Sequence, residues 1–172
     1  EYYNKAKELT KTQFGNKRKL FNPIYVSDIC LADCPYCGYR ISNKGIPRKT
    51  LKPLEVVQEA NYLGSRGVSN LLLLAGDYKH SKYVEMLSEN ISALKKQVNP
   101  NWLGIEVATL DVSEYAKLKN AGAESVTVFQ ETYNRKRYAE LHTVTEYKGD
   151  FDNRYYAQER AIKGGFEEVG FG

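Results

Sequence analysis

The sequence predicts an α/β protein built as a partial (βα) barrel with parallel strands. Short apolar runs of strand length alternate with longer segments in which apolar residues recur every three or four positions, the spacing of a helix. No hairpin signal joins neighbouring runs, so each strand should lead into a crossover helix and a parallel neighbour. An open barrel is favoured over a flat nucleotide fold because no G-x-G-x-x-G follows the first run and no Walker motif is present.

The expected strands are short and mostly aliphatic. The second, Leu71 to Ala75, is apolar throughout, which is typical of a strand buried on both faces. No helix covers the fifth strand before the sequence stops, and a closed eight-stranded barrel needs about 250 residues. We therefore expect residues 1–172 to form one domain, the N-terminal portion of a longer barrel. The five expected strands are residues 24–26, 71–75, 103–108, 125–129 and 168–171.

The expected helices carry start and stop signals. Pro53 stands in the first turn of one helix, and Gly67 lies just beyond its end. Gly122 and Gly164 end two later helices. In the helix that begins near Tyr83, apolar residues recur at spacings of three and four. The expected helices are residues 2–9, 53–63, 83–94, 112–120, 134–141 and 151–163.

The composition fits a globular domain, with 42% hydrophobic residues and a net charge of +4. The basic residues Lys11, Lys17, Arg18 and Lys19 lack interleaved aromatic residues, so they predict a solvated face and no nucleic-acid partner. No apolar stretch approaches about 20 residues, so no membrane span is expected. No basic and apolar leader opens the sequence, which favours a reduced, cytoplasmic protein.

All three cysteines lie close together, as Cys30, Cys34 and Cys37. The C-x3-C-x2-C spacing favours a metal site over a disulfide framework. Three thiolates can bind three irons of a [4Fe–4S] cluster and leave the fourth iron open to a small molecule. The alternatives are a zinc site completed by His80 or His142, an electron-transfer module, which would normally use four cysteines, or three unpaired thiols.

Acidic residues stand at the ends of three successive expected strands. They are Asp77, which follows Gly76, then Glu106 and Glu131. The carboxyl ends of parallel barrel strands converge, so we expect these acids to lie near the cysteine loop. A single acid such as Asp77 is as often a helix cap, but three together suit a cationic, amine-bearing ligand. Arg154 begins the following helix, where it could pair with a carboxylate of that ligand.

Several segments resemble the radical S-adenosylmethionine (SAM) aromatic amino acid lyases, which act in thiamine biosynthesis and in [FeFe]-hydrogenase maturation. The superfamily-wide part of the resemblance is the cysteine loop, continued by Gly-Tyr-Arg. The lead-in Phe-Asn-Pro-Ile-Tyr at 21–25 also matches, and the more selective parts are Gln-Glu-Thr-Tyr at 130–133, Asp-Phe-Asp-x-Arg at 150–154 and Val-Gly-Phe-Gly at 169–172. The resemblance extends from about Gly15 to the last residue and implies a barrel of the radical SAM type.

The resemblance also implies cofactors and site residues. The cofactors would be a [4Fe–4S] cluster, held by Cys30, Cys34 and Cys37, and SAM. Tyr36 would lie beside the adenine of SAM, and Asp77 would bind the SAM amino group at a position where relatives usually have Glu. His80 and His142 are given no role and are expected at the surface or in helix caps. The residues implied for SAM or substrate binding are Tyr36, Gly76, Asp77, Glu106, Glu131 and Arg154.

The implied activity is a radical carbon–carbon cleavage. A 5′-deoxyadenosyl radical made from SAM would break the Cα–Cβ bond of tyrosine, giving p-cresol and 2-iminoacetate (dehydroglycine). The alternatives are a hydrogenase-maturation tyrosine lyase that yields carbon monoxide and cyanide, or a tryptophan lyase. The implied partners are an amino acid substrate, an electron donor such as flavodoxin or ferredoxin, and a protein of the same pathway.

Overall fold

The computed structural model describes residues 1–17, 19–78, 81–142 and 146–172. Its centre is a five-stranded sheet in which every neighbouring pair is parallel, in the order β1-β2-β3-β4-β5. This order confirms the predicted succession of parallel strands, and β1 and β5 form the two edges. The strands are β1 (Asn22–Ser27), β2 (Asn70–Ala75), β3 (Trp102–Glu106), β4 (Ser125–Val128) and β5 (Glu168–Phe171).

Four helices cover one face of this sheet and touch one another in chain order, α2 with α3, α3 with α4, and α4 with α8. They are α2 (Pro53–Ser65), α3 (Tyr83–Gln97), α4 (Val112–Ala121) and α8 (Ala157–Lys163). Glu55 and Glu114 each accept a hydrogen bond from the backbone N–H at the start of their own helix, which fixes where α2 and α4 begin. Gly122 ends α4 with φ at 119°, a conformation that favours glycine.

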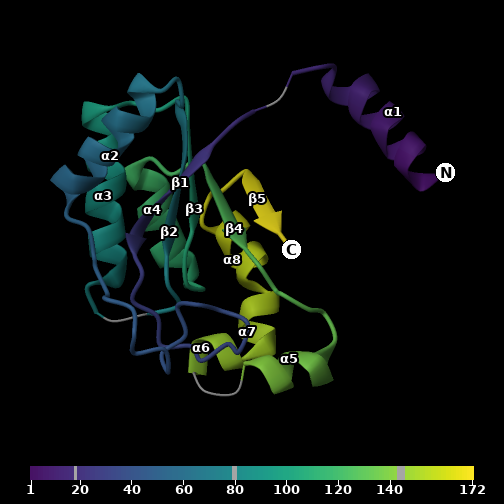
Figure 1. Cartoon of the computed structure of the whole chain (residues 1–172), viewed down its shortest axis with the longest axis vertical. Coiled ribbons are helices and arrows are strands. Elements are labelled where there is room, and N and C mark those ends of the chain that lie inside the picture. The colour runs from purple at the N-terminus through teal and green to yellow at the C-terminus, as the bar shows by residue number, and fades with distance from the viewer. Residues whose placement is uncertain (18, 79–80, 143–145) are drawn as a thin grey trace.

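Three short helices gather at the carboxyl ends of the strands, at the bottom of Figure 1. They are α5 (Arg135–Leu141), α6 (Glu146–Gly149) and α7 (Phe151–Tyr155). At the opposite end, α1 (Tyr2–Phe14) stands apart from the body of the protein and has no buried residue. Across the described ranges, no helix is both long enough and apolar enough to cross a membrane.

The sequence-based expectations were wrong at two places. The helix expected at 151–163 is divided, because Tyr156 ends α7 and begins α8. The guanidinium of Arg160 donates to the carbonyl oxygen of Asn153 at 2.7 Å, which gives that oxygen a partner outside a continuous helical ladder. The strand β2 is buried at Leu71, Leu72 and Leu73 but not along its whole length, since Leu74, on the face opposite the helices, is only half-buried and lines the cavity.

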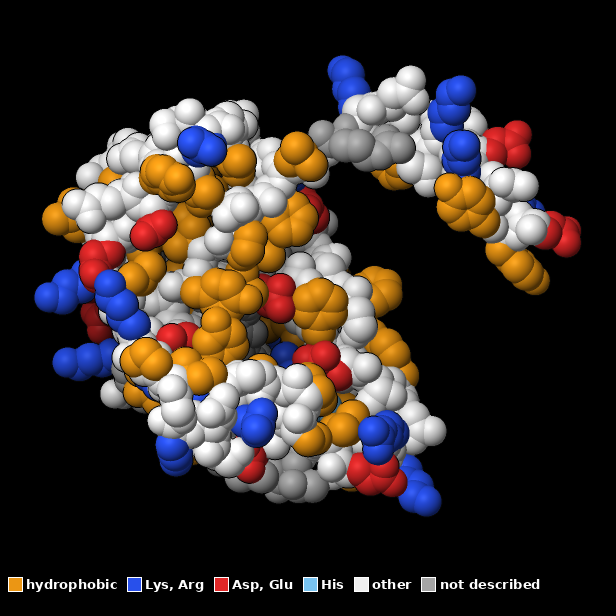
Figure 2. Space-filling view, viewed as in Figure 1, with side chains coloured by type: hydrophobic (Ala, Val, Ile, Leu, Met, Phe, Trp, Pro, Cys, Tyr) orange, Lys and Arg blue, Asp and Glu red, His pale blue; other side chains and the backbone are white. Residues whose placement is uncertain are grey.

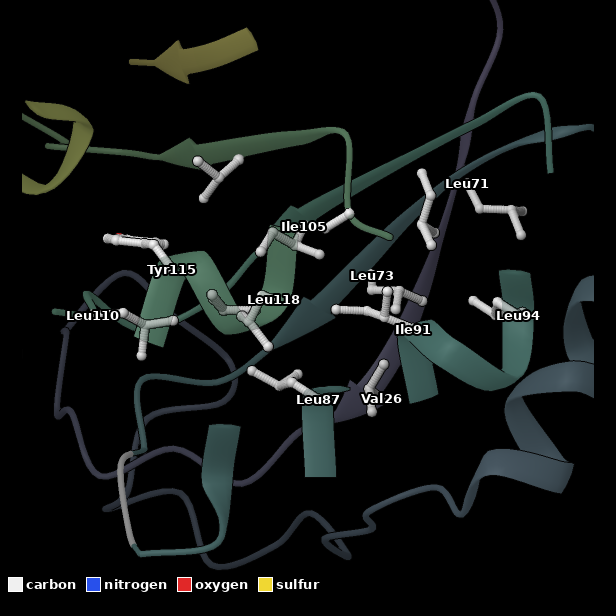
Figure 3. Packing of buried hydrophobic residues seen from close by; sticks show 14 of the residues in the cluster. Val26, Leu71, Leu73, Leu87, Ile91, Leu94, Ile105, Leu110, Tyr115 and Leu118 are labelled. Carbon is white, nitrogen blue, oxygen red and sulfur yellow. The ribbon is translucent and has the colours of Figure 1, made fainter. Parts of the chain in front are cut away.

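The hydrophobic core lies between the sheet and the helices. In Figure 3, side chains from the helix-facing side of β1, β2 and β3 meet those of α3 and α4. Leu87, Ile91 and Leu94 recur on one face of α3 at spacings of four and three, and none of them is exposed. The strand residues that pack in this layer include Val26, Leu71, Leu73 and Ile105.

Replacing Leu87 with Ala is expected to lower the free energy of unfolding by about 2–5 kcal/mol, because it removes buried methyl groups and leaves a cavity. Urea denaturation of the full-length protein measures this change. The matched control is Leu54→Ala on α2, where the side chain is 63% exposed and the loss should stay within about 0.5 kcal/mol. Equal losses in the two variants would contradict the placement of the core.

Candidate active site

A row of side chains crosses the sheet on the face opposite the helices. Tyr25, Leu74, Glu106 and Thr127 are successive register partners on β1 to β4, so they point to the same side. A register shift in β1 between Tyr25 and Ser27 marks a bulge before the last pair of the ladder, Ser27 with Ala75, and bulges often redirect side chains beside active sites. The row therefore brings an aromatic and an acidic side chain to the open face of the barrel.

The cysteine loop begins where β1 ends and crosses the strand ends. Arg48 ties the two sides of the loop together by donating to the carbonyl oxygens of Asp28 at 2.8 Å and Arg40 at 3.0 Å. The backbone N–H of Leu31 donates to the carbonyl oxygen of Asp77 at 3.0 Å, which fastens the loop to the end of β2. The loop is thus anchored on both sides of the cysteines.

The three cysteines are free thiols, with Cys34 buried and Cys30 and Cys37 half-buried. Burial raises the pKa of the Cys30 and Cys34 thiols, so both would ionise most readily beside a strongly positive centre. In the part of the chain that the structure describes, no three Cys, His, Asp or Glu side chains converge on a single metal ion. A [4Fe–4S] cluster does not need such convergence, because each thiolate binds a different iron.

Gly76 lets the end of β2 approach the cysteine loop. A Cβ added at this position would lie 2.1 Å from the carbonyl oxygen of Ile29 and 3.0 Å from the Cβ of Cys30. The Gly76 N–H also donates to the carbonyl oxygen of Ser27 at 2.9 Å, so the strand and the loop are fixed against each other. Because Gly76 has no side chain, the cysteine loop can pack directly against the end of β2.

Four charged side chains form a chain of alternating sign beside this loop. The Arg154 guanidinium lies 2.7 Å from the Asp77 carboxylate, and Lys148 lies 4.0 Å from Asp77 and 2.9 Å from Glu131. The side chains of Arg154 and Lys148 are 8% exposed, and that of Asp77 is 9% exposed. Burial opposes the charge of Arg154, but Asp77, Tyr138 and Glu131 together outweigh it, so the pKa of Arg154 is raised. Each buried charge therefore has an opposite partner.

Two acidic groups at this edge of the sheet, one in the network and one beside it, still have capacity for a ligand. Oδ1 of Asp77 is buried and makes no hydrogen bond within the described chain. Glu106 is half-buried and likewise has no hydrogen bond or ion pair among the described residues. Burial, and then the charge of Glu131, raise the pKa of Glu106. A cationic ligand with N–H donors would satisfy both carboxyl groups.

The backbone of Glu131 is strained. Its φ is 70°, and Asn99 is the other non-glycine residue with positive φ within the described ranges. Such a conformation costs of the order of 1–3 kcal/mol and persists where surrounding contacts hold it. Here the ion pair with Lys148 holds the Glu131 side chain at the cavity.

A single cavity gathers every residue that the sequence predicted for the site. Figure 2 shows a hollow on this face, with acidic and basic side chains set among hydrophobic ones. Lys148, Tyr25 and Tyr39 also line the cavity and were not predicted. No sequence pattern predicted Lys148 as a site residue, because α6 is only four residues long and has no periodicity of its own. The predicted residues that line the cavity are Cys30, Cys34, Tyr36, Cys37, Gly76, Asp77, Glu106, Glu131 and Arg154.

His142, one of the two histidines considered for a zinc site, does not support one. Both ring nitrogens of His142 already lie within hydrogen-bond distance of protein atoms, Nε2 at 2.6 Å from the Tyr36 hydroxyl and Nδ1 at 3.1 Å from the carbonyl oxygen of Tyr138. His142 is the C-cap of α5, as expected of a capping residue, but it is buried and does not lie at the surface. His80 lies outside the described residues.

A comparison with protein families matches residues 24–172 to the model described as the radical SAM superfamily. The chain belongs to the radical SAM superfamily. Radical SAM enzymes use a [4Fe–4S] cluster together with SAM, and the fold and the grouped cysteines agree with this membership. The predicted membership of the radical SAM superfamily is thereby confirmed.

Relatives within the superfamily match nearly the whole chain. The 2-iminoacetate synthase of Escherichia coli (strain K12) is 34% identical over 98% of this chain and 44% of its own length. The FeFe-hydrogenase maturase HydG from Carboxydothermus hydrogenoformans superimposes with a TM-score of 0.93 at 32% identity, over 98% of this chain and 39% of HydG. Methylornithine synthase (PylB) superimposes with a TM-score of 0.82 at 25% identity. The chain thus spans less than half the length of these relatives.

The residues present fit the two cofactors of the superfamily. Three thiols without disulfide partners line the cavity. They lie beside Gly76, a position at which a side chain would not fit. The unpartnered Oδ1 of Asp77 and the unpaired carboxyl of Glu106 can accept hydrogen bonds from the N–H groups of the SAM amino group, which remain donors when its nitrogen binds iron. Arg154 was expected to pair with a ligand carboxylate, but in this structure Asp77 is its carboxylate partner.

Replacing Gly76 with Ala is expected to displace the cysteine loop and reduce iron incorporation, because the new Cβ would overlap the backbone of Ile29. Iron per chain, measured after anaerobic reconstitution of the full-length protein, and the thermal midpoint of the apoprotein report the two effects. The control is Gly64→Ala in α2, where a Cβ meets no atom within 4 Å. Full iron content and an unchanged midpoint in Gly76→Ala would contradict this account.

Replacing Glu106 with Gln is expected to stabilise the apoprotein at neutral pH. The raised pKa means that the folded protein holds this proton more tightly than the unfolded chain. The contribution of Glu106 to stability is therefore present below the unfolded pKa of about 4.3 and lost as pH rises through the folded pKa. The gain from Glu106→Gln should be small near pH 4 and grow towards pH 8 in urea denaturation. A pH-independent gain would contradict a buried, unpaired carboxyl.

Proposed function

We propose that the full-length protein is a radical SAM lyase that breaks the Cα–Cβ bond of tyrosine. The products would be p-cresol and 2-iminoacetate, which serves the synthesis of the thiamine thiazole. The observation that carries the proposal is the 34% identity to a 2-iminoacetate synthase across 98% of this chain. The charged cavity at the strand ends supports it, because an amino acid substrate and SAM both carry an ammonium and a carboxylate group.

The cysteines and the carboxylates have separate roles in this proposal. Cys30, Cys34 and Cys37 hold the cluster, and Tyr36 forms the wall beside the adenosyl group. When bound, the reduced cluster and SAM supply the one-electron chemistry that begins the reaction. The remaining task of the protein is to orient the two ligands and to keep water away from them.

The charges of the cavity favour a cationic ligand. Four carboxylates line the cavity, Asp28, Asp77, Glu106 and Glu131, against two cations, Lys148 and Arg154, which leaves two negative charges if all six groups are ionised. An ammonium group placed between Glu106 and Oδ1 of Asp77 would compensate one of them. Lys148 and Arg154 keep Glu131 and Asp77 paired, so that the site is charged and ordered before the ligand arrives.

A second candidate function is the tyrosine lyase of [FeFe]-hydrogenase maturation, which would yield carbon monoxide and cyanide. The TM-score of 0.93 with HydG favours it. Both candidates need an electron donor, for which flavodoxin or ferredoxin is suited, and both begin by breaking the same bond of tyrosine. The products formed after this first cleavage distinguish the two.

The full-length protein, reconstituted and reduced anaerobically with SAM, is expected to convert tyrosine to p-cresol and a two-carbon imine. Parallel incubations with tyrosine and tryptophan, followed by mass spectrometry, measure the products and 5′-deoxyadenosine. Cys34→Ala is the control and should form neither, because the chain has no spare cysteine to replace a cluster ligand.

Each outcome of this assay has a defined reading. Detection of 2-iminoacetate or its hydrolysis product as the end product supports the thiamine-type lyase, and carbon monoxide with cyanide supports the maturation lyase. Deoxyadenosine formed only with tryptophan would overturn the choice of tyrosine. No deoxyadenosine with either amino acid would overturn the aromatic lyase proposal.

A further inference from the structure

A hydrogen bond joins two residues of the site that lie far apart in the sequence. Tyr36 stands between the second and third cysteines, and His142 ends α5, 106 positions later. The Tyr36 hydroxyl oxygen lies 2.6 Å from Nε2 of His142, and the two rings meet edge to face at 84° with centroids 5.7 Å apart. This contact connects the cysteine loop to the short helices beside the strand ends.

The direction of this hydrogen bond follows from the other side of the His142 ring. Nδ1 lies 3.1 Å from the carbonyl oxygen of Tyr138, which can only accept a hydrogen bond. Nδ1 therefore carries the proton of the neutral ring, and Nε2 presents a lone pair to the hydroxyl of Tyr36. Tyr36 donates and His142 accepts.

His142 is itself rigidly held. Its ring is 4% exposed and packs on the ring of Tyr138 at a centroid distance of 4.2 Å. Tyr138 is buried in turn, donates to the carbonyl oxygen of Lys148 at 2.5 Å and meets the edge of Phe151. Nε2 of His142, the acceptor for the Tyr36 hydroxyl, is therefore held in a fixed position.

Tyr36 needs such a fixed acceptor, because the other contact of its hydroxyl is with the thiol of Cys34, a side chain of the same loop that cannot hold the ring against the rest of the fold. The residue is 52% exposed and lines the cavity. Tyrosine has two rotatable side-chain torsions, and a ring open to solvent would sample several orientations. The bond to His142 selects one of them, and it also restrains the backbone between Cys34 and Cys37.

We propose that His142 is a positioning residue that holds the Tyr36 ring as a preformed wall for the adenosyl group of SAM. The adenosyl ligand rests on the proposed function, whereas the bond between the two rings does not. Fixing the ring before binding removes the entropy cost of ordering it when the ligand arrives. His142 acts through Tyr36 and does not touch the ligand itself.

A double-mutant cycle in the full-length protein tests this role. His142→Phe keeps a ring against Tyr138 but has no acceptor, and Tyr36→Phe keeps the cavity wall but has no donor. We measure SAM affinity by calorimetry on the unreduced, reconstituted protein, so that no turnover is needed. In the apoprotein we measure amide hydrogen exchange across residues 30–41. Tyr133→Phe, at a tyrosine 53% exposed, is the control for loss of a surface hydroxyl.

Each single variant is expected to weaken SAM binding by about 2- to 10-fold, the range for loss of one hydrogen bond. The double variant should be no weaker than the weaker single variant, because both remove the same bond. His142→Gln retains an acceptor and should recover most of the affinity. Amide exchange in the cysteine loop should rise in both single variants, at least as much in Tyr36→Phe, which also loses the contact with Cys34, and stay unchanged in Tyr133→Phe.

Other outcomes overturn the proposal. Effects of the two single variants that multiply in the double variant would show that His142 and Tyr36 act independently. Unchanged affinity in His142→Phe would show that the residue only caps α5. A parent protein that assembles no cluster or binds no SAM would refute the proposed function instead. In that case the amide exchange measurement still decides, and unchanged exchange of residues 30–41 in His142→Phe would refute the role of His142.

Discussion

All five strands run in the same direction, and this constraint decides where every functional side chain lies. Parallel strands in one sheet bring their carboxyl ends to one edge, so residues from four separate loops meet there. The cysteines follow β1, Gly76 and Asp77 follow β2, Glu106 ends β3, and Glu131 lies beyond β4. The helices on the opposite face supply the buried area that keeps this edge in place.

The buried charges favour particular ligands at the carboxyl edge of the sheet, but burying them costs free energy. Taking Arg154 and Asp77 out of water costs several kcal/mol per ion, which their mutual attraction offsets only because they are in direct contact. Lys148 extends the pairing to Glu131, whose left-handed backbone adds strain. Carboxyl groups that remain unpaired within the described chain, at Glu106 and Oδ1 of Asp77, indicate that the arrangement is completed by a ligand.

The sequence predicted the parts of the site that follow directly from strand direction. Cys30, Asp77 and Glu106 could be found because they stand at the ends of recognisable apolar runs. Lys148, which lines the cavity, and His142, which contacts Tyr36, could not, because tertiary packing of short helices without a periodic pattern places them there. The sequence also did not predict that the expected helix at 151–163 is divided, since the division depends on the hydrogen bond from the Arg160 guanidinium to the carbonyl oxygen of Asn153.

The central claim is that three cysteines hold a cluster whose open iron meets SAM at this edge of the sheet. Electron–nuclear double resonance on the full-length, reduced protein with SAM labelled by ¹⁵N at the amino group tests it most directly. The account predicts a ¹⁵N coupling to the reduced cluster, which requires the amino group to bind the open iron. A reduced cluster without any ¹⁵N coupling, or a protein that contains zinc instead of iron and sulfide, would contradict it.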